Sequence, residues 1–163
     1  MRSKKLFLVL SIIVPFLLYC VYYYGMMVKN APYKFSEFQS IQFEFGYRDR
    51  MLNKYNSVTG DYQYINKRDS VVKMHLKLTN DDLLYLHRKA AELGFWDFPA
   101  NEMSDDSASR APRYIMQFNY KRKSKKVVFD ANYNGQEKLV DANQRLIKEI
   151  EKILGDAEAR QKK

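Results

Sequence analysis

Three side chains capable of acid or base chemistry fall on polar positions of predicted strands: Glu44, His75 and Asp130. A histidine and two carboxylates can exchange protons with a substrate when they lie within hydrogen-bonding reach of a reacting group. Their strands would have to bring them together on the open side of a sheet. Antiparallel sheets normally carry polar residues on one solvated face, so a small envelope hydrolase built on these three residues is retained only as an alternative.

Metal and cofactor chemistry has little support in the sequence. Glu102, Asp105 and Asp106 offer oxygen ligands for a hard cation, but their spacing differs from that of an EF-hand loop. The two histidines, His75 and His87, have no metal-ligand spacing, and each is expected at the surface or its boundary. G-x-S-x-G, P-loop and G-x-G-x-x-G motifs are missing from the sequence. We therefore predict no catalytic residue, no metal and no cofactor.

The densest charge in the chain is the run KRKSKK at residues 121–126. A solvated, aggregation-resistant hairpin tip is one interpretation. The alternative is contact with an anionic surface, where each basic residue near anionic lipid contributes on the order of 1 kcal/mol. The cations concerned are Lys121, Arg122, Lys123, Lys125 and Lys126. Nucleic acid is not expected as a partner, because the nearby aromatic residues alternate as core residues do.

The elements that must position these groups follow from hydrophobic periodicity. Apolar residues alternate with polar ones at 41–47, 62–65, 72–78, 114–120 and 127–133, which predicts strands. Thr79 and Asp82 resemble a capping box at the start of a helix that ends at Gly94, and helical spacing returns from Leu139 to Leu154. The predicted fold is α+β, in the order β-β-β-α-β-β-α, with a small antiparallel sheet and two helices on one face.

The N-terminal segment predicts a transmembrane helix. Residues 6–24 carry no charge, and at about 1.5 Å per residue they cover roughly the 30 Å core of a bilayer. Tyr22, Tyr23 and Tyr24 suit the membrane interface, while the cations at positions 2, 4 and 5 place the N-terminus inside. We therefore expect an uncleaved signal anchor in the cytoplasmic membrane, a single pass, and a periplasmic or otherwise extracytoplasmic domain.

Cys20 raises the alternative of a lipoprotein that is acylated at this residue after cleavage. Leu17 suits a lipobox, but Tyr19 stands where such motifs carry a small residue. The apolar run is also longer than the roughly 7 to 15 residues of a signal-peptide core, and no A-x-A-like cleavage site follows it. The sequence therefore favours the uncleaved anchor over the lipoprotein.

The predicted organisation is an anchor at 1–28, a connector at 29–37, a globular domain at 38–155 and a charged tail at 156–163 that frays. Hydrophobic residues make up 46% of the chain and aromatic residues 15%, which argues against disorder. With its single cysteine in the anchor, the globular domain cannot contain a disulfide or a thiolate zinc site. The net charge of +9 favours anionic partners.

The stretch TNDDLLYLHRKAAELGFWDFP at residues 79–99 resembles a pattern in uncharacterised bacterial envelope and lipoprotein-type domains of unknown function. The resemblance covers about an eighth of the chain and consists of an amphipathic helix followed by an aromatic stop. It implies a bacterial, extracytoplasmic placement and carries over no functional residue.

These observations predict a membrane-tethered, non-enzymatic binding or accessory module. Its expected partners are anionic lipid head groups or an envelope protein, recognised through the sheet face or the hairpin tip. A small hydrolase and an inhibitor-like protein that presents a loop to an enzyme are the alternatives from other functional classes.

Overall fold

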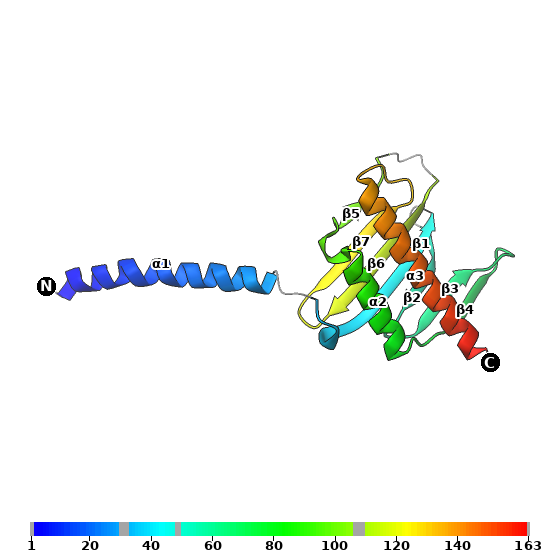
Figure 1. Cartoon of the computed structure of the whole chain (residues 1–163), viewed down its shortest axis with the longest axis horizontal. Coiled ribbons are helices and arrows are strands. Elements are labelled where there is room, and N and C mark those ends of the chain that lie inside the picture. The colour runs from blue at the N-terminus through cyan, green and yellow to red at the C-terminus, as the bar shows by residue number, and fades with distance from the viewer. Residues whose placement is uncertain (1, 30–32, 48–49, 106–109, 163) are drawn as a thin grey trace. The chain divides into compact units, whose positions relative to one another are not determined.

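A computed structural model of the chain describes residues 2–29, 33–47, 50–105 and 110–162. The chain divides into two compact units, Met1–Tyr33 and Lys34–Lys163. The first unit contains the helix α1 (Arg2–Lys29). The second contains the whole sheet and the other helices (Figure 1).

The first unit corrects the predicted membrane anchor. Within the described residues, the structure contains no helix with the length and apolar character that crossing a membrane requires. The interfacial role predicted for Tyr22, Tyr23 and Tyr24, and the predicted location of the globular domain, are not tested by this finding and stay predictions.

The second unit is built on a seven-stranded sheet with the strand order β4-β3-β2-β1-β6-β7-β5. Its neighbouring strands are antiparallel except for β5 and β7, which are parallel. The strands are β1 (Phe38–Tyr47), β2 (Arg50–Asn56), β3 (Asp61–Ile65), β4 (Val71–His75), β5 (Asn101–Glu102), β6 (Pro112–Tyr120) and β7 (Ser124–Asp130).

The helices α2 (Asn80–Glu92) and α3 (Glu137–Gln161) lie on the same face of the sheet (Figure 1). Short 3-10 turns, η1 (Phe35–Glu37) and η2 (Phe95–Asp97), precede β1 and follow α2. The core forms between the helices and this face of the sheet. Its largest fully buried side chains include Phe43, Phe95, Phe118, Phe129, Leu86, Leu146 and Ile150.

The prediction of five strands was wrong, because the sheet has seven. β2 was missed because only Tyr55 of its seven residues is buried, so the strand shows no clear alternation of apolar and polar residues. β5 pairs only Asn101 and Glu102, in a stretch for which the sequence predicted neither strand nor helix. The observed order is therefore β-β-β-β-α-β-β-β-α.

Local signals around α2 were predicted correctly. Thr79 is the N-cap, and its side chain and that of Asp82 form a complete capping box. Gly94 follows the helix with a left-handed φ of 75°. The aromatic residues after it pack against β6, where the centres of the Phe95 and Trp96 rings lie 5.3 and 5.5 Å from that of the Phe118 ring.

The C-terminal segment does not end its helix at Gly155, contrary to the prediction of a frayed tail. α3 continues to Gln161 and buries Ala157. The Tyr64 hydroxyl on β3 donates a hydrogen bond to Glu158 at 2.8 Å, and Arg160 pairs with the α2 residue Asp82 at 2.5 Å. These contacts hold the last helical turns against β3 and α2.

Candidate binding surface on the open sheet face

The face of the sheet opposite the helices carries rows of polar side chains that cross several strands. One row is set by the cross-strand register of Lys73, Gln63, Lys54 and Glu44 on β4, β3, β2 and β1. A second row places His75, Asp61, Asn56 and Gln42 side by side, and it continues through Gln117 to Lys126. Directly opposed residues have Cβ atoms about 5 Å apart, so each row is a line of neighbouring side chains.

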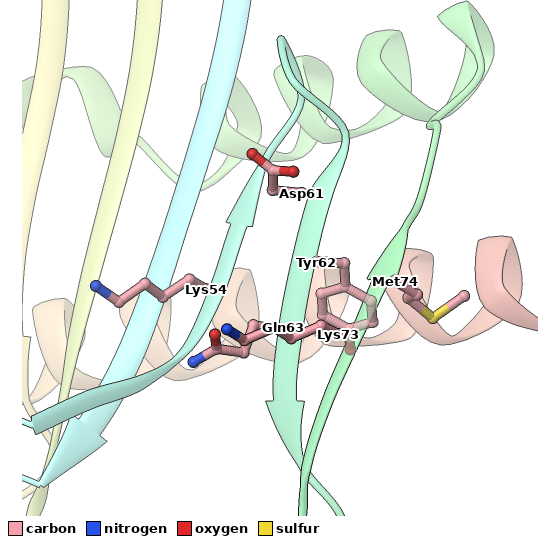
Figure 2. Close-up of a pocket in the computed structure, with 6 residues that line it drawn as sticks. All are labelled: Lys54, Asp61, Tyr62, Gln63, Lys73 and Met74. Carbon is pink, nitrogen blue, oxygen red and sulfur yellow. The ribbon is translucent and has the colours of Figure 1, made fainter.

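A pocket of about 290 Å³ lies on β2, β3 and β4. Figure 2 shows Lys54, Gln63 and Lys73 crossing three adjacent strands, with Asp61 further along β3. Tyr62 and Met74 complete the lining. The pocket therefore combines two ammonium groups, one carboxylate and one amide, a set that can hold a ligand bearing a negative charge and hydrogen-bonding groups.

Charge along the first row is balanced at one end only. Lys54 lies 3.9 Å from Glu44, and its side chain remains 53% exposed. Gln63 donates a hydrogen bond from its side chain to the Leu52 carbonyl at 2.8 Å. Lys73 forms no ion pair with any carboxylate in the part of the chain that the structure describes. Its ammonium group is the charge on this row that a ligand can neutralise.

The three acid and base candidates do not meet. Glu44, His75 and Asp130 lie on β1, β4 and β7, and β2 and β3 separate the first two. With about 4.8 Å between neighbouring strands, Glu44 and His75 are about 14 Å apart across the sheet. Glu44 and Asp130 are about 10 Å apart by the same spacing. Proton transfer among the three residues at one substrate group is not possible at these separations.

Asp130 has a structural partner instead. Arg113 donates two hydrogen bonds to its carboxylate, at 2.7 and 3.0 Å, and the Ser104 backbone N–H donates a third at 3.1 Å. The hydrogen bonds from Arg113 lower the pKa of Asp130 below its usual value, against the opposing effect of burial. This bidentate pair joins β6 to β7 and fixes the segment after β5.

The predicted hairpin tip is formed, but part of its charge is already engaged. Arg122 pairs with Glu37 of η1 at 2.8 Å. Lys125 points to the helix side, where its ammonium group donates to the Phe98 carbonyl, and burial lowers its pKa. The five-cation surface expected from the sequence therefore presents fewer outward cations than the residue count suggests.

The oxygen ligands proposed for a cation are not assembled into a site among the described residues. Glu102 is fully buried, whereas Asp105 is exposed, and Asp106 lies outside the described residues. Across the same described parts of the chain, no three His, Cys, Asp or Glu side chains are grouped closely enough to hold a metal ion.

Glu102, which the sequence offered as an oxygen ligand for a cation, is a buried acid in the structure. Its Oε2 accepts a hydrogen bond from the Asn143 side chain of α3 at 2.5 Å, and Asn143 is also fully buried. Glu102 Oε1 and Asn143 Oδ1 have no hydrogen-bond partner. Burial raises the Glu102 pKa to about 7, although the Asn143 hydrogen bond and the Lys125 charge oppose the shift. The one available sequence signal was Asn143, a polar residue on the apolar stripe of its helix.

His87 was predicted at the surface or its boundary, and the structure corrects this. It is 9% exposed, its Nδ1 lies 2.7 Å from the Tyr120 hydroxyl, and its ring contacts Phe35 and Trp96. Burial is the main cause of its lowered pKa. His87 extends the apolar face of α2 by one position and belongs to the core, whereas His75 is exposed as expected.

The fold and this surface together define an α+β domain whose antiparallel sheet is covered by helices on one face and open on the other. No family model matches the chain, and no curated protein and no solved structure matches it.

Proposed function

We propose that the unit Lys34–Lys163 is a non-enzymatic binding module that recognises a partner protein through the open face of its sheet. The observation that carries this proposal is the pair of polar rows that cross the uncovered face, with a pocket at their β2–β4 end. A non-obligate protein interface is only about as apolar as the rest of the protein surface and has a polar rim, so a broad polar face can serve as one.

Two further observations support this choice over the alternatives. The acid and base candidates for a hydrolase lie on separate strands, about 10 to 14 Å apart. The hairpin tip, which was the other candidate surface, has Arg122 and Lys125 engaged in contacts within the domain. The open face keeps exposed cations at Lys54, Lys73 and Lys126, so it is the better surface for an anionic partner.

Photo-crosslinking in the native organism tests the proposal. A photoreactive residue replaces Lys54 on the open face in one full-length variant, and Lys152 on the exposed side of α3 in the matched control. We expect one discrete protein adduct from position 54 and none from position 152. Once that partner is purified, Gln42→Arg at the centre of the open face should weaken its binding. Equal adducts from both positions, or an adduct from position 152 alone, would show that the open face is not the recognition surface.

A further inference from the structure

The strand β4 forms one edge of the sheet and presents an ordered backbone to solvent. It pairs with β3, and among the described residues no strand lies on its other side. Two hydrogen bonds set the phase of the β3–β4 ladder: Leu76 N–H to Gly60, and Asn66 N–H to Ser70. Because bonded and non-bonded pairs alternate in an antiparallel ladder, Met74 and Val72 bond to β3.

By the same alternation, the backbone groups of every second residue of β4 point away from β3. The backbone N–H and C=O groups of Val71, Lys73 and His75 point away from β3, and the side chains of these residues lie on the open face. Val71 is 50% exposed, so part of its apolar surface is open to solvent at this edge. One edge therefore combines unpaired backbone groups with an apolar and a cationic side chain.

From this edge we infer the partner that the open face takes: an extended peptide segment that adds to β4 as an eighth strand and places a carboxylate opposite Lys73. This inference rests on the proposed function and specifies its ligand. Strand addition supplies affinity through backbone hydrogen bonds, while side-chain positions at alternate residues supply specificity.

The charges along the first row determine which charge the added strand should carry opposite Lys73. Glu44 neutralises Lys54, and Gln63 is neutral. Lys73 ends the row without an ion pair among the described residues, and the carboxylate of Asp61 lies one row further along β3. Opposite charges across neighbouring strands stabilise pairing, and like charges oppose it. The next residue on this row, supplied by the added strand, should therefore be Asp or Glu. Ile65 and Val71 are paired across β3 and β4. The added strand should therefore carry an apolar residue opposite Val71, two positions from its acidic residue.

The same rule disfavours a second copy of this chain. An antiparallel pair of β4 strands centred on the middle residue would place Lys73 opposite Lys73 of the other copy. Lysine on an edge strand is known to discourage such self-association. Lys73 therefore disfavours pairing between two β4 strands and favours pairing of β4 with an acidic segment.

The test measures binding of a fluorescent peptide to the full chain by anisotropy. The peptide Thr-Thr-Thr-Glu-Thr-Val-Thr, paired antiparallel to β4, places its Glu opposite Lys73 and its Val opposite Val71. A matched peptide has Lys in place of Glu. We expect the acidic peptide to bind about fivefold more tightly than the basic one, as expected for one cross-strand charge pair. Lys73→Glu should reverse the preference, and Val71→Pro, which removes an outward N–H at a tolerated edge position, should weaken both peptides.

Lys152→Glu is the control, because it makes the same charge change at an exposed residue of α3, on the other side of the sheet from the open face. It should leave the preference for the acidic peptide unchanged. Equal binding of the two peptides, or an equal effect of Lys152→Glu and Lys73→Glu, overturns strand addition at β4. That result leaves the crosslinking test of the open face unaffected. Concentration-dependent dimers that Val71→Pro abolishes would identify a second copy as the occupant and also refute the inference.

Discussion

The buried pair of Glu102 and Asn143 makes a quantitative prediction about pH. With Glu102 ionised, Glu102 Oε1 and Asn143 Oδ1 are both buried acceptors without a donor. A proton on Glu102 provides a donor between two such acceptors, so the protonated acid suits this site better than the carboxylate. The substitution Glu102→Gln reproduces the protonated acid in shape and supplies an amide N–H that cannot ionise.

The magnitude follows from the displaced pKa. The Glu102 pKa rises from 4.5 to about 7, and at about 1.4 kcal/mol per unit the difference corresponds to about 3 kcal/mol. Because the folded-state pKa is the higher one, the folded protein binds the proton more tightly than the unfolded chain does. The stabilisation is complete below about pH 4.5 and is lost as the pH rises through about 7.

The assay is urea unfolding of the full chain, followed through the fluorescence of Trp96, the single tryptophan. Wild type and Glu102→Gln should have nearly equal free energies of unfolding at about pH 4, and the variant should be more stable by about 3 kcal/mol at about pH 8. His87 also titrates, in the opposite direction because burial lowers its pKa, but it is present in both proteins and cancels in the difference. A stability difference that stays constant between these two pH values would refute the assignment of a protonated Glu102.

Three smaller perturbations test the surrounding structure by the same unfolding assay. Thr79→Ala removes half of the capping box and should cost about 1 kcal/mol, while a stability equal to wild type would mean that the cap contributes little. Gly60→Ala should cost more than about 1 kcal/mol, because Gly60 has a φ of 71° and an added Cβ would collide with the His75 ring; a neutral substitution would contradict this turn geometry. Asp130→Asn should cost about 2 kcal/mol near neutral pH by weakening the pair with Arg113. Because the folded pKa of Asp130 is lowered, that loss should shrink as the pH falls below about 4, and a loss independent of pH would argue against the ion pair.

Elements with strong local signals were predictable from the sequence. The capping box at Thr79 and the left-handed Gly94 depend on a few residues within one turn, so the sequence alone specifies them. The β6–β7 hairpin shows clear alternation because one face of each strand is buried against the helices. In both cases the physical cause lies within about ten residues of the pattern.

Elements that depend on distant partners were not predictable. β2 has few buried residues and is held in place by backbone pairing with β1 and β3, which leaves little trace in its own sequence. The burial of Glu102 depends on α3, more than forty positions away, where Asn143 supplies its hydrogen bond at 2.5 Å. A glutamate in a polar stretch has the same local pattern whether it is solvated or buried.

The distribution of side chains over the two faces explains why recognition is assigned to the open side. The aromatic residues of β1, β6 and β7 point mainly toward the helices, where Phe43, Phe118 and Phe129 are at most 1% exposed. Stability is thus supplied by one face, and substitutions on the other can change charge with little effect on the core. On that second face, ion pairs account for Glu44 and Arg113, while Lys73 at the edge forms no ion pair among the described residues. A partner that supplies a carboxylate here extends the pattern already present across β1 to β4, without rearrangement of the packed side.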